Sequence, residues 1–321
     1  MTTLTRVVAF CAALLVSGSA FAQQYPSKPV KIIIPFAAGG VTDIAGRLIA
    51  QKLSERLGQQ FYIENHGGAG GNLGMGAAAR SAGDGYTILL ASSSYVVNPS
   101  LYSKPPYDAD KDFIPVTKAG GTPNAWLVHP SFPAKTMKEL IDLIKREPGK
   151  HSVASPGSGT TPSLSIEMLK LGLGLDFVIV PFPGGGPSTQ STLAGHTPIT
   201  CGALGNAVNL IKEGKLRALS VAAKKRSAAM PDVPTLEEFG IKGQEAETMQ
   251  GVFVPAGTPK AIVDLLQREV SMIVNMPDIK ERLLQLGIEA EGNSSADFDA
   301  YVKAEIAKWK KVIEDAKIAK I

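Results

Sequence analysis

Cysteine is scarce in this chain of 321 residues, which contains only two, at positions 11 and 201. Cys11 lies in an apolar run near the N-terminus that we expect to be removed. The mature chain would then keep one thiol and could form no intrachain disulfide. Without disulfides an exported protein relies on its hydrophobic core, and about 300 residues can bury a large one. Cys201 lies in the apolar stretch 199–204, so we expect an inert, buried thiol.

Apolar runs long enough to cross a membrane are also missing. Residues 7–18 form an apolar run of about a dozen residues, whereas a transmembrane helix needs about 20. The run follows Arg6 and ends before Ala20-Phe21-Ala22, an arrangement typical of a cleavable secretory signal. We therefore expect residues 1–22 to be a signal peptide, cleaved near Ala22, and the mature protein to lie in the periplasm.

Strong charge of one sign is absent as well. The formal net charge is +4, and the densest basic cluster, residues 224–226, has no aromatic side chains between its cations. Such a cluster is typical of a solvated turn and does not indicate a nucleic-acid surface. We expect a monomer that binds no nucleic acid.

Catalytic and cofactor-binding motifs are missing too. The chain has no Gly-x-x-x-x-Gly-Lys-Ser/Thr loop, no Gly-x-Ser-x-Gly elbow and no Ser-x-x-Lys. After Gly68-Ala69-Gly70 the dinucleotide fingerprint would need glycine at position 73, which is Leu73. The histidines do not have the spacing of metal ligands and lie at positions 66, 129, 151 and 196. We expect no catalytic residue, no metal and no cofactor, and therefore not an enzyme.

What the chain does contain is an alternation of short apolar strands and helices. Runs of β-branched and apolar residues predict strands at 30–36, 61–64, 86–91, 152–155, 176–182 and 216–222. Cap and turn residues predict helices that start at Thr42 or Asp43, after the glycines near 70, at Thr136 with Glu139, at Thr160 or Thr161, at 184–188, at 258 and at 295. This alternation predicts an α/β fold in which parallel-type sheets are flanked by helices.

Two such sheets, joined by crossing segments, would form two lobes with a cleft between them. We expect the crossings near residues 126–129 and 251–255. The first lobe then comprises residues 23–123 plus 250–321, and the second lobe residues 124–249. Ligands of such folds bind at the carboxyl ends of strands, where loops lead into helix N-termini.

Four strand-to-helix loops are rich in Gly, Ser and Thr and contain no Lys or Arg; they are residues 36–42, 92–98, 155–163 and 183–189. A helix N-terminus has free N–H groups and a partial positive charge, so it can hold an anion without a cationic side chain. Each loop alone is explained at least as well as a plain turn. Several of them in an exported protein favour reversible capture of a carboxylate.

The chain resembles the receptor family of tripartite tricarboxylate transporters, also called Bug receptors. The resemblance rests on motifs in one order, at residues 25–30 (Tyr-Pro-Ser-Lys-Pro-Val), 35–43 (Pro-Phe-Ala-Ala-Gly-Gly-Val-Thr-Asp), 64–72 (Glu-Asn-His-Gly-Gly-Ala-Gly-Gly-Asn), 84–87, 98–102, 214–219, 231–235 and 255–259. It implies a type II periplasmic-binding fold, a two-lobed "Venus flytrap" that holds a small carboxylate between its lobes. It also implies membrane permease subunits as partners.

The resemblance further implies which residues contact the ligand. From the first lobe they are Phe36, Ala38, Gly40, Thr42 and Asp43. From the second lobe they are Ser155, Gly157, Ser158, Gly159, Thr160, Gly184, Gly186, Pro187 and Ala203. We add Ser94 from the serine-rich loop, and we expect the main role of Asp43 to be that of an N-cap.

This chain departs from many relatives at three positions. It has Pro198 and Gly202 where they have acidic residues, and Ser163 where they have His. A desolvated ammonium needs an acceptor, ideally a carboxylate, so we expect a carboxylate ligand without a free amino group, either mono- or dicarboxylate. One alternative stays open: the same fold serves a co-receptor that presents its ligand to a membrane sensor kinase.

Overall fold

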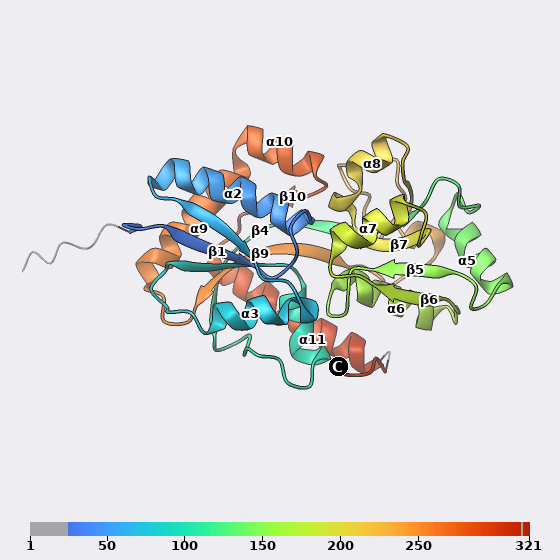
Figure 1. Cartoon of the computed structure of the whole chain (residues 1–321), viewed down its shortest axis with the longest axis horizontal. Coiled ribbons are helices and arrows are strands. Elements are labelled where there is room, and N and C mark those ends of the chain that lie inside the picture. Colours follow the sequence, from blue (N-terminus) through green and yellow to red (C-terminus); the bar gives the residue numbers. More distant parts are fainter. Residues whose placement is uncertain (1–24, 316) are drawn as a thin grey trace, which may run out of the picture.

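The computed structural model describes residues 25–315 and 317–321, so the predicted signal peptide, residues 1–22, lies outside the described residues. Figure 1 shows an elongated molecule with two lobes, each a sheet with helices on both faces, joined by long strands through the middle. The predicted two-lobed α/β fold is confirmed. Among the described helices, none is both long enough and apolar enough to cross a membrane.

Strands of the first lobe pair in the order β2-β1-β3-β9-β4, with β10 also on β4. They are β1 (Val30–Ile34), β2 (Phe61–Asn65), β3 (Thr87–Ala91), β4 (Phe113–Val128), β9 (Glu247–Pro255) and β10 (Glu289–Ala290). The second lobe continues from β4 through β7 (Ile199–Ala203) and β5 (Ser152–Ser155) to β6 (Val178–Pro181), and β8 (Arg217–Val221) also pairs with β4. One continuous path of paired strands therefore links the two lobes.

Helices cover both faces of each sheet. Those of the first lobe are α2 (Val41–Leu57), α3 (Asn72–Ala79), α4 (Ser94–Leu101), α9 (Lys260–Asn275), α10 (Pro277–Gln285) and α11 (Ser295–Asp315). Those of the second are α5 (Met137–Arg146), α6 (Thr161–Gly172), α7 (Gly185–Leu193) and α8 (Val208–Lys212). Short 3-10 turns lie at η1 (Ala69–Gly71), η2 (Leu204–Asn206) and η3 (Glu237–Phe239).

The crossing strands β4 and β9 make the sheets mixed and not purely parallel. β1, β2 and β3 pair in parallel, as do β5, β6 and β7, whereas β4 and β9 run antiparallel to each other over most of their length. The predicted crossing at 126–129 lies at the C-terminal end of β4, where that strand pairs with the second lobe. The one at 251–255 lies at the C-terminal end of β9, where that strand pairs with the first lobe. The exact lobe boundaries stay a prediction, because residues of β4 and β9 contribute to both lobes.

Close packing of α2 against the first sheet sets the position of its N-terminus. A Cβ added at Gly46 would lie 2.7 Å from side-chain atoms of Ile34 and Leu90, so only glycine lets the helix approach this closely. Ile49 and Leu53 are buried on the same face. Ile44, by contrast, is 38% exposed because the helix packs through the positions beside it.

Candidate functional site

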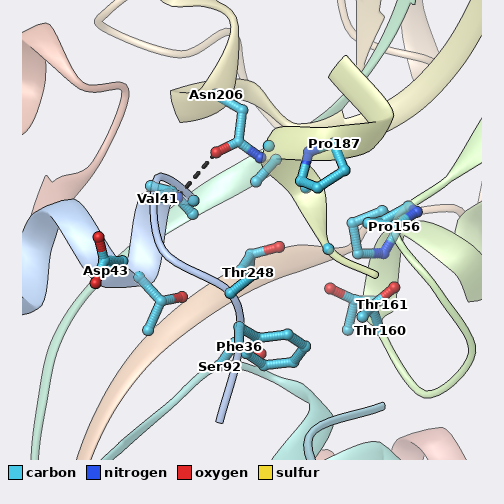
Figure 2. A pocket seen from close by; sticks show the side chains of 18 residues that line it. Phe36, Val41, Asp43, Ser92, Pro156, Thr160, Thr161, Pro187, Asn206 and Thr248 are labelled. Atoms are coloured by element: carbon cyan, nitrogen blue, oxygen red, sulfur yellow. Dashed lines mark hydrogen bonds between the residues drawn. The ribbon is translucent and has the colours of Figure 1, made fainter. Parts of the chain in front are cut away.

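A cavity lies in the cleft between the lobes and encloses about 550 Å³ of space free of protein atoms, part of it open to solvent. Figure 2 shows how both lobes contribute side chains to it. The lining residues are Phe36, Ala37, Gly40, Val41, Thr42, Asp43, Ser92, Pro156, Thr160, Thr161, Pro162, Gly184, Gly185, Gly186, Pro187, Ala203, Asn206 and Thr248. Of these, only Asp43 has an ionisable side chain, so this lining offers a ligand no cationic group.

The N-terminus of α2 faces the cavity with backbone donors. Its N-cap is Gly40, which has no side chain to accept a hydrogen bond from the first turn. The first N–H groups of a helix have no partner within the helix, so those of Thr42 and Asp43 are free to bind an anion. The N–H of Val41 donates instead to the Oδ1 atom of Asn206 in the second lobe, at 2.9 Å.

Asp43 holds the loop before α2 in place. One carboxylate oxygen, Oδ2, accepts hydrogen bonds from the Gly39 N–H and from the Arg47 side chain, both at 3.0 Å. The other, Oδ1, accepts from the Asn65 amide at 2.9 Å, and the same amide donates to the Phe36 carbonyl at 3.1 Å. The expected N-cap role of Asp43 is therefore wrong, because Asp43 is the third residue of the helix. Its side chain instead stabilises the loop before α2 through hydrogen bonds.

The hydrogen bonds of Asp43 also determine its charge. Burial opposes ionisation of this carboxyl, but hydrogen bonds from Arg47, Gly39 and Asn65 outweigh burial and lower its pKa. The carboxylate is thus charged at neutral pH, and Arg47 balances that charge at 3.0 Å. Because its oxygens are already engaged, Asp43 is a poor acceptor for a ligand ammonium.

A second helix N-terminus, that of α7, approaches from the other lobe. Its N-cap Gly184 has no side-chain cap, and Gly185 and Gly186 supply first-turn N–H groups without a partner in the helix. A Cβ added at Gly186 would lie 3.6 Å from the Gly39 carbonyl oxygen and 3.8 Å from the Gly40 nitrogen. The positive ends of α2 and α7 therefore meet across the cleft, an arrangement that an anion between them would stabilise.

The N-terminus of α6 is different because, of its first three residues, only Thr161 has an N–H group that is not capped. Thr160 is its N-cap, as predicted, and its hydroxyl oxygen accepts the Ser163 N–H at 3.3 Å. The same hydroxyl donates to the Gly157 carbonyl at 2.8 Å, and Pro162 in the first turn has no N–H. In this structure the Thr160 hydroxyl proton therefore points to the Gly157 carbonyl and not into the cavity.

Buried hydrogen bonds tie both lobes to β9 at the floor of the cavity. The Glu247 carbonyl accepts from the Ser93 hydroxyl at 2.9 Å and from the Thr161 hydroxyl at 2.7 Å. Next along the strand, the Thr248 hydroxyl donates to the Asn124 Oδ1 atom at 3.1 Å. The floor is thus a polar network that spans the crossing strands.

The structure brings together nine of the fifteen predicted contact residues in the cavity lining: Phe36, Gly40, Thr42, Asp43, Thr160, Gly184, Gly186, Pro187 and Ala203. The other six, which lie outside the lining, are Ala38, Ser94, Ser155, Gly157, Ser158 and Gly159. Of these, Ser158 and Gly159 lie where the lobes touch, since a Cβ at Gly70 would collide with the Ser158 carbonyl. Contact of the fifteen with a ligand stays a prediction.

Two lining residues lie outside every predicted loop and were not among the fifteen predicted contact residues. Asn206 follows β7 and accepts the Val41 N–H at the N-terminus of α2, and Thr248 lies within the crossing strand β9. Neither carries a local motif: one is a single Asn in an apolar stretch, and the other a single Thr in a strand. The crossing strand β9 brings Thr248 to the cavity, and the turn η2 after β7 brings Asn206 there.

Among the described residues, Cys201 lies outside the cavity lining and no metal-binding cluster is present. Burial raises the pKa of the Cys201 thiol far above its ordinary value, and the side chain is fully buried in β7. In residues 25–315 and 317–321, His, Cys, Asp and Glu form no group of three that could hold a metal ion. The cleft is therefore suited to binding, through backbone N–H groups and neutral side chains.

Comparisons with known proteins agree with this geometry. The sequence profile described as "Tripartite tricarboxylate transporter family receptor" matches residues 45–318. The periplasmic binding protein BugD is 34% identical, with a TM-score of 0.89, and the match covers 92% of this chain and 100% of that one. This likeness confirms the predicted periplasmic-binding fold.

Two similar structures contain a ligand. A protein of R. palustris with adipate is 32% identical, with a TM-score of 0.89, over 92% of this chain and 100% of that one. MatC from Rhodopseudomonas palustris with bound malate is 34% identical, with a TM-score of 0.85, over 90% and 100%. With the profile match over most of its length, the chain belongs to the tripartite tricarboxylate transporter receptor family.

Proposed function

We propose that this protein is an extracytoplasmic receptor that captures a small carboxylate between its lobes. The observation that carries the proposal is the meeting of the α2 and α7 N-termini at a cavity without cationic side chains. Each helix end contributes N–H groups that are suited to a carboxylate. Charge-assisted hydrogen bonds contribute roughly 1.5–3 kcal/mol each, so a few of them hold a carboxylate without Arg or Lys.

The relatives support the ligand class and the partner. Two similar proteins were solved with adipate and with malate, both small carboxylates. The family is that of receptors of tripartite transporters, so we propose that the bound acid is delivered to membrane permease subunits. Delivery by such a receptor requires export, which the predicted signal peptide, residues 1–22, would provide. We propose that the mature protein is a monomer in the periplasm.

The ligand should carry no free amino group. Asp43 is the one carboxylate in the lining, and its oxygens are engaged by Gly39, Arg47 and Asn65. An ammonium in the cavity would therefore lose its hydration without gaining a charged partner. We expect aspartate and glutamate to bind more weakly than succinate and glutarate.

A thermal-shift screen followed by calorimetric titration tests the proposal. The panel contains mono- and dicarboxylates, aromatic acids, the two acidic amino acids, and neutral sugars as controls. A ligand at 100 times its Kd stabilises the folded protein by about 2.7 kcal/mol, which a melting curve resolves. Binding of at least one acid but of no sugar is the expected result, and a folded protein that binds none of the acids would refute the receptor assignment.

Delivery to a transporter needs a separate test in cells. Deletion of the gene should abolish uptake of the labelled acid, and a copy with its signal peptide should restore that uptake. If uptake persists while the transcriptional response to the acid is lost, the protein acts as a co-receptor for a sensor and not as a transport receptor.

A further inference from the structure

The cavity has two ends of opposite hydrogen-bonding character. At the end formed by α2 and α7, the available groups are backbone N–H donors, from Thr42 and Asp43 on one side and Gly185 and Gly186 on the other. Beside the N-terminus of α6, the lining has the hydroxyls of Thr160 and Thr161 and, from β9, that of Thr248, all three labelled in Figure 2. We call this part of the cavity the threonine end. What those hydroxyls offer a ligand depends on where their protons point.

Each of the three threonine hydroxyls donates its proton to an oxygen of the protein. Thr160 donates to the Gly157 carbonyl at 2.8 Å, and Thr161 to the Glu247 carbonyl at 2.7 Å. Thr248 donates to Asn124 Oδ1 at 3.1 Å. Backbone carbonyl oxygens only accept, so the direction of the Thr160 and Thr161 bonds is settled, and that of the Thr248 bond depends on the orientation of the Asn124 amide. The hydroxyl oxygens can therefore present only lone pairs to the cavity.

The orientation of the Asn124 amide is also determined by its neighbours. Its Nδ2 atom lies 3.1 Å from the Ser165 hydroxyl oxygen, and that hydroxyl donates to the Thr161 carbonyl at 3.0 Å. Since the Ser165 proton is committed, Asn124 must donate to Ser165 and turn its oxygen to Thr248. Asn124, Thr161 and Ser165 are all buried, so water does not offer these groups easy alternative partners.

From this polarity we infer that the preferred ligand has one carboxylate and, across an apolar body, one uncharged hydrogen-bond donor such as a hydroxyl. The carboxylate binds between α2 and α7, and the donor points at the threonine oxygens. Phe36, Pro156 and Pro187 line the space between and suit an apolar body. The inference rests on the proposed receptor function and narrows its ligand class.

A second carboxylate at the threonine end would be poorly accommodated. Its oxygens would face hydroxyl lone pairs, and the lining has no Lys, Arg or His to compensate. To donate to it, Thr161 or Thr248 would have to release a buried carbonyl or amide oxygen without a partner, which is unfavourable. The Ser92 hydroxyl oxygen accepts the Ser94 N–H at 3.4 Å and lies 3.3 Å from the Ser94 hydroxyl oxygen, where either hydroxyl can be the donor.

Matched trios of acids test the inference by calorimetric titration of the purified full-length mature protein. For each chain length from four to eight carbons, the trio is the alkanoate, the ω-hydroxyalkanoate and the α,ω-dicarboxylate. Benzoate, 4-hydroxybenzoate and terephthalate form an aromatic trio. We expect the hydroxy acid to bind at least about tenfold more tightly than both other members in the trio whose length fits, which corresponds to about 1.4 kcal/mol.

The possible outcomes separate this inference from the receptor function. If the dicarboxylate or the unsubstituted acid is the tightest member of every trio, the inference is overturned and the carboxylate receptor stands. If no acid of any trio binds to folded protein, the receptor function itself fails.

A variant pair locates the donor contact. In Thr248→Val the acceptor oxygen is lost, whereas Thr248→Ser keeps it. The preference for the hydroxy acid over the unsubstituted acid should fall below about threefold in T248V and persist in T248S. A general structural perturbation would weaken both acids and leave their ratio unchanged, and an unchanged ratio in T248V would overturn the contact.

Discussion

The N-termini of α2 and α6 occupy corresponding places in the two lobes but offer the cleft different chemistry. Each follows a parallel strand, β1 or β5, and each borders the same cavity. α2 begins at Gly40 without a side-chain cap, so its first-turn N–H groups stay available to a ligand. α6 begins at Thr160, which caps Ser163, and has Pro162 in its first turn. The residue at the cap, and not the glycine content of the loop, decides which helix end can bind an anion.

α7 resembles α2 in this respect, and the largest expected effect is at its N-terminus. Gly186→Asp would place a carboxylate between the two helix ends, since a Cβ there has ordinary contacts with Gly39 and Gly40. The new carboxylate occupies the anion site and repels the ligand. We expect the Kd of the tightest acid of the panel to rise roughly a hundredfold or more, because like-charge juxtaposition costs several kcal/mol.

Gly186→Asn is the matched control, because it has nearly the same shape without the charge. Calorimetric titration should show only a small loss of affinity for this variant. Equal losses in G186D and G186N would mean that bulk and not charge is responsible, and would move the anion site away from α7.

A smaller effect on ligand affinity is expected from removing Asp43, whose side chain stabilises the loop before α2. Asp43→Ala leaves the Gly39 N–H, Arg47 and Asn65 without their shared acceptor. We expect the free energy of unfolding to fall by roughly 1.5–3 kcal/mol, the range for hydrogen bonds to a charged group. Ligand affinity should fall by about tenfold, because the loop must then be ordered on binding. Chemical denaturation and titration measure the two effects.

The charge of Asp43 also gives a pH dependence with a defined sign. The pKa of this carboxyl is lowered in the folded protein, so its stabilising contribution is complete above the ordinary Asp pKa of about 3.9. That contribution is lost as the pH falls through the lower folded-state pKa. The stability difference between wild type and Asp43→Asn should therefore shrink below pH 4. A difference that grows on acidification would contradict this assignment.

Asn206 provides a hydrogen bond between the lobes with a still smaller expected effect. Its side chain accepts the Val41 N–H at 2.9 Å, so it links the second lobe to the helix end that binds the anion. Asn206→Ala should disfavour closure and raise the Kd about fivefold, as expected for a net hydrogen bond of about 1 kcal/mol. Small-angle scattering with and without ligand should show closure in both proteins, with more ligand needed in N206A.

Asn209→Ala is the control for that variant, because Asn209 lies on the exposed face of α8, away from the cavity lining. Its Kd should match the wild-type value. If N206A binds as tightly as N209A, the bond to Val41 does not contribute to the closed state.

Sequence patterns predicted the parts of the fold that are governed by local chemistry. The strand at 152–155 and the Thr160 cap agree with the structure, because both depend on neighbouring residues only. The 16-residue strand β4 was largely missed, since Gly120, Gly121 and Pro123 read as breaks. The structure uses these residues where other chain segments approach: a Cβ at Gly120 would lie 2.5 Å from the Glu289 carbonyl oxygen, a contact that no local pattern encodes.

The residues of the candidate site also fall into those that local sequence patterns predicted and those that they did not. Gly40 and Gly186 were predicted from loops that lead into helices. Thr248 reaches the cavity through the crossing strand β9 and Asn206 through the turn η2 after β7, and no loop motif indicated either residue. The Thr160 hydroxyl donates its proton to a carbonyl three residues earlier, a contact that only the folded loop shows.

The smallest effect on ligand affinity is expected when the N-cap of α6 is changed to glycine, the N-cap residue of α2. Thr160→Gly removes the cap that satisfies the Ser163 N–H and the hydroxyl oxygen that faces the cavity. Glycine is nearly as good an N-cap as threonine, so the free energy of unfolding should fall by only about 0.5 kcal/mol, whereas Thr160→Ala should cost about 1 kcal/mol. With one acceptor gone and one N–H freed, dicarboxylates should gain up to about threefold in affinity relative to hydroxy acids. Thr160→Ser, which keeps both hydrogen bonds, is the control. If T160G leaves the ratio of dicarboxylate to hydroxy-acid affinity at the T160S value, the cap of α6 does not discriminate between them, and the contrast between the two helix ends is one of stability alone.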